Sequence, residues 1–395
     1  MNKLSSIAYY VTDKISSNDI SLSEYVTTDC ILQNKKGREV ASNLPPQPCC
    51  LTRYQRGDIL IANIRPYLKK VWFADIDGGA SSDVLVFRAK EGHSPSFLYA
   101  VLLQDSFFDY VMQGAKGSKM PRGDKEQILR YEMPILSCSE ESIGTFFLNL
   151  DQKIRLNEQI NQNLEAMAKQ LYDYWFVQFD FPNEEGKPYK SSGGEMVWNE
   201  KLKRKIPNEW DNCKLKDFIN LFDSKRIPLS SKDREERKGN YPYYGATGIM
   251  DYVNEYIFDG DYILLAEDGS TSDSKGFPIV QYIWGKNWVN NHAHIILPKN
   301  EQYLMFTYQM LRSIPAKQIE TGSIQKKISQ ENLCEYNMVL PNSILIEKYE
   351  SIISPLWEKR KLCIEEINAL IKQRDELLPL LMNGQASVNS DLADD

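Results

Sequence analysis

Histidine is scarce in this sequence, and the short motifs that mark common enzymes are missing. Three histidines among 395 residues leave little acid–base chemistry near neutral pH. The chain contains no Gly-x-Gly-x-x-Gly loop, no phosphate-binding P-loop and no Asn/Asp-Pro-Pro-Tyr/Phe motif of the amino-methyltransferases. Zinc-protease and catalytic-triad signatures are also missing. These absences argue against a catalytic site in this chain.

Paired cysteines and long apolar runs are lacking as well. The seven cysteines are scattered and odd in number, and only Cys49 and Cys50 are close together. No CxxC or Cys/His spacing occurs, so we predict no metal site. No run approaches the roughly 18 apolar residues of a membrane span, and the first residues lack the apolar core of a secretory signal. We therefore expect a cytoplasmic protein with no membrane partner.

The formal net charge is -7 and the pI is near 5.3, which by itself argues against nucleic-acid binding. A local basic surface can still bind phosphates while acidic helices elsewhere carry the balance. The distribution of the basic residues therefore matters more than their total.

The sequence repeats itself weakly at long range. Residues 117–133 align without gaps on residues 322–338, so that Tyr131 falls on Tyr336 and Met133 falls on Met338. Upstream, Gly-Asp followed by an apolar run occurs in both halves. A period of about 205 residues is too long for a solenoid and indicates a duplicated unit of a domain and a helix.

Apolar residues at heptad spacing predict two long helices, from about 140 to 177 and from about 343 to 382. Two such helices would stabilise each other as an antiparallel pair, with Asn157 and Asn161 on the seam. We expect Pro355 to kink the second helix or to mark a later start. A long helical hairpin that serves only as a spacer or a partner-binding stalk is the plain alternative.

Short β-branched and aromatic runs between turn residues predict strand-rich domains outside these helices. The predicted fold class is α+β, with two mixed α/β domains separated by two long antiparallel helices that act as a coiled-coil spacer. The predicted parts are a first domain (1–139), a central helix (140–180), a linker (181–205), a second domain (206–342), a C-terminal helix (343–384) and a flexible tail (385–395).

Basic and aromatic residues gather in predicted loops of both domains. Lysine and arginine neutralise phosphates, hydroxyl groups fix position on a duplex, and arginine or glutamine can read base edges. A solvated surface is the alternative for any single cluster, but matching clusters precede the repeated segments in both halves. The candidate DNA contacts are Lys35, Lys36, Arg38, Arg65, Tyr67, Lys69, Lys116, Ser118, Lys119, Arg122, Lys225, Arg226, Tyr244, Lys275, Ser323, Gln325, Lys326 and Lys327.

Two of the three histidines, His292 and His294, are two residues apart on a predicted strand, so both should face the same side. A metal site would need further ligands that the sequence does not reveal. Polar contacts within the protein or contacts with DNA are the favoured interpretation of this pair.

The centre and the end of the chain resemble a known family. The segments are YDYWFVQFDFP at 172–182, GKPYKSSGG at 186–194, IPNEW at 206–210 and RDELLPLLMNGQ at 374–385. They are similar to the central and C-terminal regions of type I restriction–modification specificity subunits. GDILIANIRPY at 57–67 and KMPRGD at 119–124 resemble one class of that family's target recognition domains, and YYGATG at 243–248 resembles another.

The resemblance implies two target recognition domains held on two antiparallel helices, each domain reading half of a split double-stranded DNA site. It implies no cofactor on this chain. Two methyltransferase (modification) subunits would use S-adenosylmethionine, and restriction (motor) subunits would use ATP and Mg. The partner-docking helices would present Leu150, Ile154, Leu164, Leu171, Trp175, Ile364, Ile367, Ile371 and Leu378.

Because the recognition loops of the two halves differ, the DNA site should be asymmetric, with half-sites about one turn of duplex apart. Two alternatives remain open. One is a coiled-coil adaptor without a DNA role, which the paired basic loops disfavour. The other is a stand-alone enzyme such as a nuclease.

Overall fold

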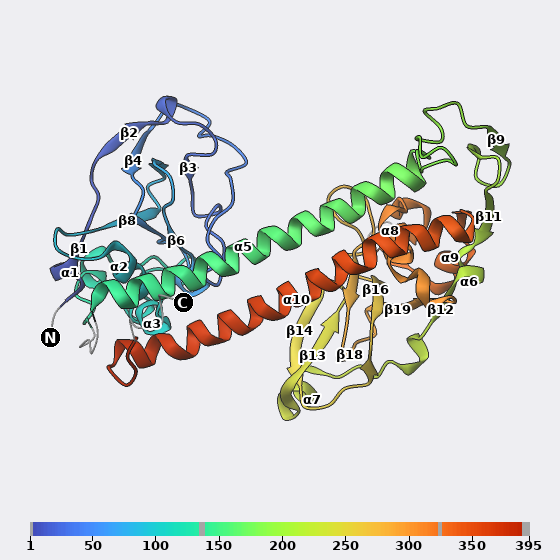
Figure 1. The fold of residues 1–395 in the computed structure, drawn as a ribbon. Helices are drawn as coiled ribbons and strands as arrows, with labels where there is room; N and C mark the ends of the chain where they lie inside the picture. Colours follow the sequence, from blue (N-terminus) through green and yellow to red (C-terminus); the bar gives the residue numbers. More distant parts are fainter. Residues whose placement is uncertain (1–2, 134–138, 323–325, 389–395) are drawn as a thin grey trace. The chain divides into compact units, whose positions relative to one another are not determined.

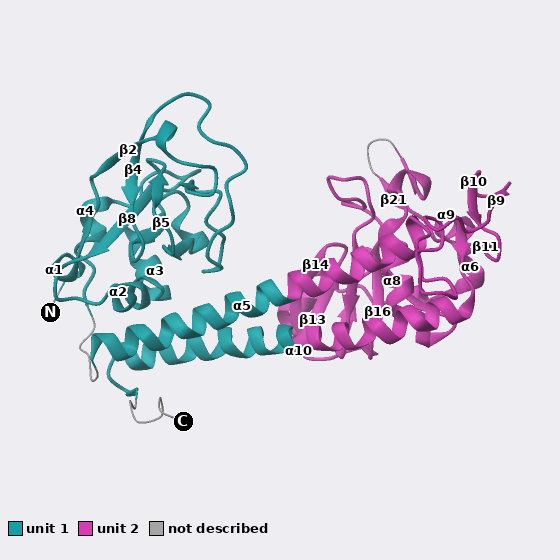
Figure 2. Cartoon of the chain, turned by 45° about the horizontal axis from the view of Figure 1, so that its top comes forward, with its two compact units in different colours: residues 1–160, 362–395 teal, residues 161–361 magenta. Residues whose placement is uncertain are grey.

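The computed structural model describes residues 3–133, 139–322 and 326–388, and it divides into two compact units (Figures 1 and 2). Unit 1 consists of residues 1–160 and 362–395, and unit 2 of residues 161–361. The division differs from the boundaries predicted from the sequence. Each long helix contributes residues to both units, so each unit holds one domain together with a part of both helices.

One four-stranded antiparallel sheet has the same strand order in both units. In unit 1 the order is β1 (Ala8–Tyr10), β8 (Val84–Ala89), β5 (Ile59–Ala62), β6 (Val71–Phe73). In unit 2 it is β12 (Ile219–Leu221), β19 (Ala293–Pro298), β16 (Tyr262–Ala266), β17 (Val280–Ile283). The shared order supports the duplication inferred from the sequence repeat.

Short helices accompany this sheet, and the last one of each domain lies in an equivalent place in both units. Asp124 caps the last domain helix of unit 1 and Ser329 caps its counterpart in unit 2, and the two caps fall on each other in the sequence repeat. The helices are α1 (Leu4–Ile7), α2 (Pro95–Leu102), α3 (Asp105–Gln113) and α4 (Lys125–Ile128) in unit 1, and α6 (Leu215–Phe218), α7 (Ser231–Glu236), α8 (Leu304–Ser313) and α9 (Gln330–Glu335) in unit 2.

The second sheet differs between the units. In unit 1 the strands β2 (Lys14–Ser16), β4 (Cys50–Tyr54), β7 (Gly78–Ala80) and β3 (Tyr25–Val26) follow in that order, and the parallel pair β3–β7 lies at the edge. In unit 2 the order is β14 (Gly248–Val253), β13 (Lys238–Gly245), β18 (Lys286–Val289), β15 (Phe258–Asp259), and the parallel pair β13–β18 is central. The two domains are therefore alike in one sheet and unlike in the other.

The remaining short elements lie at loops and domain ends. They are η1 (Ser17–Asp19), η2 (Pro66–Leu68), η4 (Asp223–Lys225), η5 (Glu301–Tyr303), η6 (Ala316–Gln318), β11 (Asp211–Lys214) paired with β22 (Asn337–Leu340), and β20 (Glu320–Thr321) paired with β21 (Lys327–Ile328).

The long helices are α5 (Glu140–Tyr172), which continues as a π-helical turn η3 (Asp173–Val177), and α10 (Ser343–Met382). In unit 2, Glu165 pairs with Arg360 at 2.9 Å, and the Tyr349 hydroxyl donates to the Ala168 carbonyl at 3.1 Å. The contact partner on α10 has a lower residue number when the residue on α5 has a higher one. The two helices therefore run antiparallel.

The helix pair in unit 1 contains a buried polar contact on its seam. Asn157 is buried, and its side-chain amide donates to the Glu366 carboxylate at 2.7 Å. Asn161, in unit 2, is buried as well. Both asparagines therefore lie inward, as their heptad positions predict.

Two sequence expectations fail here. The helix α10 begins at Ser343 and continues through the exposed Pro355, so the proline does not mark a later start. The freed carbonyl on an exposed face can be hydrated, which lowers the cost of the proline. In unit 2, the segment 181–205 is not a plain linker, because β9 (Met196–Asn199) pairs with β10 (Arg204–Pro207).

Aromatic packing orders that segment. The buried Phe181 ring stacks between Tyr189 at 4.7 Å and Trp210 at 5.0 Å, measured between ring centroids. In unit 1, part of the expected tail is also packed, since Ala386 and Val388 lie against the unit's core. Among the described residues, no helix combines the length and the apolar character that crossing a bilayer requires.

Gly144 marks the closest approach of α5 to α2 in unit 1. A Cβ atom there would lie 2.3 Å from the Phe97 backbone nitrogen and 2.4 Å from the Ser96 hydroxyl. We predict that Gly144→Ala lowers the free energy of unfolding by about 1–3 kcal/mol, because backbone overlap outweighs the better helix propensity of alanine. Thermal melting of the variant against Asn149→Ala, an exposed position of the same helix, measures the effect. Equal melting temperatures would contradict it.

Glu350 is a buried carboxyl group on α10 that accepts a hydrogen bond from the Phe306 backbone nitrogen at 2.7 Å, in the first turn of α8. Burial raises its pKa to about 7. Because the folded state holds the proton more tightly than the unfolded chain, this group's contribution to stability is present below pH 4.5 and is lost as the pH rises through 7.

Glu350→Gln should therefore stabilise unit 2 at pH 8, by on the order of 2 to 3 kcal/mol, and leave it almost unchanged at pH 5. Melting curves at the two pH values test this, with Glu347→Gln as the exposed control on the same helix. A gain of the same size at both pH values would show that the carboxyl charge is not the cause.

Candidate nucleic-acid interface

Two of the three basic clusters predicted in the first domain, at 65–70 and 116–122, lie together at the carboxyl end of β5. The Asn63 nitrogen donates to the Asp83 carbonyl at 2.9 Å, and the Arg65 nitrogen donates to the Pro121 carbonyl at 2.8 Å. The Gly123 nitrogen donates back to Asn63 at 3.3 Å. Three segments, 63–70, 81–83 and 114–123, are joined in this way into one surface of unit 1.

The segment 116–122 forms a closed loop on that surface. Lys116 and Arg122 exchange two backbone hydrogen bonds of 2.9 Å, and Gly117 has a φ of 95°, which an L-residue rarely adopts. Ser118 and Lys119 between them are exposed. The loop thus displays a hydroxyl and a cation on a restrained backbone, which suits a phosphate contact.

The cations of this surface differ in how far they are neutralised. Lys116 pairs with Asp124 at 2.8 Å, and Arg122 pairs with Asp83 at 3.1 Å. Arg65, held at φ 53°, is exposed. Within the described part of the chain, neither Arg65 nor Lys119 has a carboxylate partner, so these two are the most available to an anionic ligand.

Two predicted contacts of unit 1 engage other parts of the protein. Lys35 is only 5% exposed, and its ammonium pairs with Asp105 at 2.8 Å, as does that of Lys69 at 2.9 Å. Burial raises the pKa of Asp105, but the hydrogen bonds from both lysines outweigh it and lower the pKa. Arg38 is half-buried and lies 4.4 Å from the centre of the Trp72 ring. The burial of Lys35 argues against a DNA contact, whereas Arg38 stays a prediction.

Other predicted contacts of unit 1 remain accessible. Lys36 and Tyr67 are exposed, the tyrosine to 49%, and Lys69 is 30% exposed beside its ion pair. Their DNA contacts stay predictions, because all three side chains are accessible.

Unit 2 builds an equivalent surface at the end of β16. The Glu267 nitrogen donates to the His292 carbonyl at 2.8 Å, and the Ile328 nitrogen donates to the Glu267 carbonyl at 2.8 Å. Lys275 is exposed in a turn. Its backbone nitrogen donates a hydrogen bond of 2.8 Å to the Asp273 carboxylate. The same three-segment arrangement therefore occurs in both units, with different side chains.

Unit 2 also holds the remaining predicted contacts. Lys326 pairs with Glu320 at 2.7 Å and Lys327 with Glu267 at 3.2 Å, yet both lysines are about half exposed. Lys225 is exposed and lies over Phe222, whereas Tyr244 is half-buried, and burial raises its pKa to about 12. The predicted contacts Ser323 and Gln325 lie outside the described residues.

Arg226, another predicted contact, belongs to a polar cluster inside unit 2. Its guanidinium donates to Glu267 at 2.8 Å and to the Ala293 carbonyl at 2.8 Å, and it lies 3.5 Å from Asp223. Burial raises the pKa of Asp223, but the hydrogen bond and the charge interaction with His294 outweigh burial. The pKa of Asp223 is therefore below its usual value. Arg226 is 13% exposed and is therefore not a DNA contact.

The prediction that His292 and His294 face the same side of one strand is wrong. His292 precedes β19 and is exposed, with its ring nitrogen 2.6 Å from Asp268, whereas His294 lies within the strand and is fully buried. The atoms of Asp223, Glu267 and His294 converge within 4.8 Å, but the Arg226 guanidinium already lies against both carboxylates. Polar contact is the interpretation that this geometry supports. Asp223 carried no sequence signal because it lies 71 residues away.

The helix side chains predicted to dock partners face the chain's own interior. Ile154 on α5, Trp175 on η3, and Ile367 and Leu378 on α10 are buried, and the other five are half-buried. The heptad stripe is thus used within the chain, and the docking of partners by its half-buried side chains stays a prediction. The exposed apolar side chains of the two helices include Leu156, Met167, Ile352 and Leu362.

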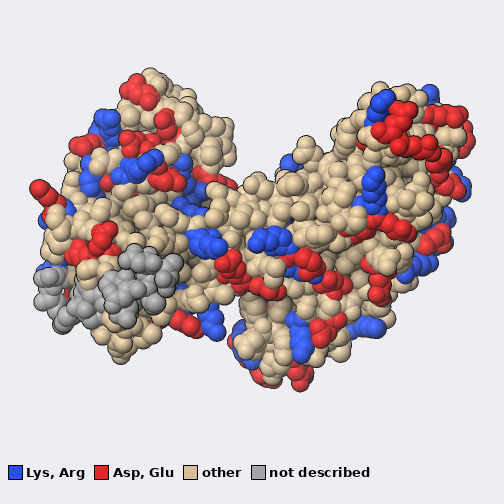
Figure 3. Space-filling model, viewed as in Figure 1, with Lys and Arg blue, Asp and Glu red and all other residues tan. Residues whose placement is uncertain are grey.

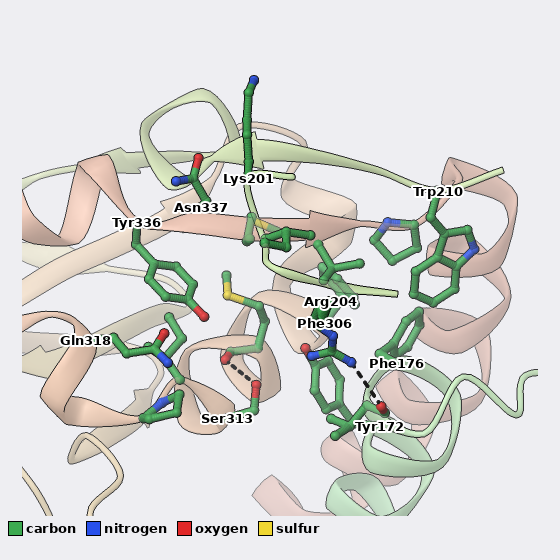
Figure 4. Close-up of a pocket in the computed structure, with 18 of the residues that line it drawn as sticks. Tyr172, Phe176, Lys201, Arg204, Trp210, Phe306, Ser313, Gln318, Tyr336 and Asn337 are labelled. Atoms are coloured by element: carbon green, nitrogen blue, oxygen red, sulfur yellow. Dashed lines mark hydrogen bonds between the residues drawn. The ribbon is translucent and has the colours of Figure 1, made fainter. Parts of the chain in front are cut away.

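A cavity of about 630 Å³ lies within unit 2 beside the end of α5 (Figure 4). Aromatic walls from Tyr172, Phe176 and Trp210 enclose it, and Arg204 donates to the Val177 carbonyl there at 3.4 Å. The carboxylate in its lining, Glu335, is held by two lysines that lower its pKa to about 2. Such a group is a poor general base, so the lining brings no catalytic pair together.

Acidic and basic side chains alternate over the visible face of each unit (Figure 3). No broad basic surface is present on that face. Any contact with nucleic acid there must therefore rest on local loops.

Taken unit by unit, the fold defines a duplicated α+β protein whose two domains carry basic loops at the same end of the same sheet. Residues 207–367 match the family described as the type I restriction modification DNA specificity domain. The chain is 22% identical to the type I restriction enzyme MjaIX specificity subunit of Methanocaldococcus jannaschii, over 95% of this chain and 86% of that protein. Over nearly its whole length the chain is thus similar to a type I restriction enzyme specificity subunit.

Two further comparisons agree. A putative type I restriction enzyme specificity subunit of Haemophilus influenzae is 34% identical over 36% of this chain and 35% of its own length. The crystal structure of the type I restriction–modification S subunit from M. genitalium matches with a TM-score of 0.59 and 16% identity, covering 96% of this chain and 95% of that one. The latter likeness concerns the fold.

Proposed function

We propose that this chain is the DNA-reading subunit of a type I restriction–modification complex, and that each unit reads one half of a split DNA site. One observation carries this proposal. Both units place basic loops at the end of the same strand of the same sheet, β5 in one and β16 in the other. The different second sheets and loop residues make an asymmetric site the natural target.

The available cations would bind phosphates, and nearby side chains would read bases. Lys119 and Ser118 on the closed loop suit the phosphate backbone, while the guanidinium of Arg65 can make paired hydrogen bonds to a guanine edge. In unit 2, Lys275 and Lys327 would play the phosphate role. Local loops of this kind explain how an acidic chain can bind DNA.

Catalysis would belong to partner proteins. Two modification subunits would bind S-adenosylmethionine and methylate adenine, and restriction subunits would use ATP and Mg. The exposed apolar side chains Leu156, Met167, Ile352 and Leu362 offer docking contacts on the long helices. We place the complex in the cytoplasm, where the DNA is accessible.

Replacing Lys119 by alanine should weaken binding to a duplex of arbitrary sequence. A lost phosphate contact lowers the slope of log affinity against log salt by about 1, so the slope should fall by about 1. Titrations of the chain assembled with its modification subunit, at several salt concentrations, measure it. Arg130→Ala removes an exposed, ion-paired cation of the same unit and serves as the control. An unchanged slope would favour an adaptor without a DNA role.

Exchanging residues 1–140 for the corresponding part of another specificity subunit should change one half of the methylated sequence and leave the other half intact. Sequencing that detects methylated bases gives the readout, and exchanging residues 206–342 should change the opposite half. Changes in both halves from either exchange would refute modular reading. Cleavage or methylation by the purified chain alone would refute the assignment of catalysis to partners.

A further inference from the structure

We infer that His294 is a positioning residue for the DNA half-site of unit 2: a buried ring whose Nε2–H donates to the backbone of β21 and fixes the strand carrying Lys327. The inference rests on the proposed function, because its consequence is measured as reading of DNA. It assigns a role to the polar cluster around His294. The proposed contacts with phosphates and bases do not by themselves give this cluster a role.

Both ring nitrogens of His294 face acceptors. Nε2 lies 2.7 Å from the carbonyl oxygen of Ile328, and Nδ1 lies 2.6 Å from a carboxylate oxygen of Asp223. A carbonyl can only accept a hydrogen bond, so Nε2 must carry hydrogen.

Asp223 fixes the other side of the ring. The oxygen that faces Nδ1 also accepts from the Gln330 side-chain amide at 2.6 Å, and the other oxygen accepts from the Ile295 backbone nitrogen at 2.8 Å. The carboxyl group is thus held by two further segments of unit 2, and it orients the ring so that Nε2 points at Ile328.

The other charged groups around the ring complete the balance. The Arg226 guanidinium contacts Glu267 at 2.8 Å and Asp223 at 3.5 Å, and Lys327 reaches the second oxygen of Glu267 at 3.2 Å. Glu267 lies 3.7 Å from His294. Arg226 and Lys327 thus already face the two carboxylates, which removes the electrostatic need for a bound metal ion.

The cluster restrains one short strand, β21. The Ile328 nitrogen donates to the Glu267 carbonyl at 2.8 Å, and the Ile328 carbonyl accepts from His294. Both backbone groups of this residue are therefore tied to the sheet. The preceding residue, Lys327, is 52% exposed and carries the cation that would meet DNA, so His294 determines where that cation is presented.

Unit 1 makes the equivalent connection without a histidine. There the Asn63 side-chain amide donates to the Gly123 carbonyl at 3.3 Å, and Arg122 pairs with Asp83 at the surface. A histidine anchor is thus specific to unit 2. Loss of the anchor should impair reading of one half-site and spare the other.

Two variants separate the ring contacts. His294→Gln has an amide nitrogen near the position of Nε2 and can still donate to the Ile328 carbonyl, whereas His294→Asn has one near Nδ1 and can donate only to Asp223. Each variant is assembled with the modification subunit and tested on duplexes in which one half-site at a time is altered. A mismatched base pair costs roughly 10- to 100-fold in affinity for a specific reader.

We expect His294→Asn to reduce discrimination at the half-site of unit 2 by about tenfold or more, which corresponds to the loss of one such contact. Discrimination at the half-site of unit 1 should not change, and His294→Gln should retain more discrimination than His294→Asn. His93→Gln is the matched control, because it breaks a histidine–carboxylate pair of 3.0 Å in unit 1. It should lower thermal stability without changing the reading of unit 2.

Other results would overturn the inference. If His294→Asn melts at a lower temperature but discriminates as the wild type does, the ring is only a structural group. If His294→Asn reads better than His294→Gln, the contact to Ile328 is not the anchor. If the wild-type assembly distinguishes no half-site at all, the proposed function fails and the inference fails with it.

Discussion

Burial of the apolar stripe of each long helix is the constraint on which both units depend. In unit 1 the stripe of α5 contributes Ile143 and Phe147 to a core that also contains Leu378 of α10. In unit 2, Phe176 and Tyr349 meet with ring centroids 5.3 Å apart in a second core. The helices are therefore part of the domains that they support, and neither domain has a complete core without them.

The same cores leave the loops that follow β5 and β16 exposed for recognition. The ends of β5 and β16 carry loops whose backbones are fixed by hydrogen bonds to two other segments, while their side chains stay exposed. A rigid scaffold with exposed loops allows the loop residues to differ between the units without loss of the core. The similarity to specificity subunits and the repeated topology both support the proposed reading of two unlike half-sites by one plan.

Much of the fold could be predicted because it depends on local periodicity. The heptad stripe located both helices, and short β-branched runs located β5, β16 and β19. Pro355 misled the prediction because its cost depends on whether the freed carbonyl is exposed, which a sequence does not reveal. The sequence predicts a linker at 181–205 because turn residues in this segment outnumber the aromatic side chains that order it.

The candidate site, too, could be predicted from the sequence only in part. The sequence by itself determined that the chain is duplicated, that its basic residues lie in loops and that no common catalytic motif is present, because these are properties of composition and spacing. Only the tertiary structure decided which cations are available. Lys35 and Arg226 resemble Arg65 and Lys119 in the sequence, yet the first two are buried against carboxylates from distant segments. Ion pairing depends on distance in space, and no local pattern encodes it.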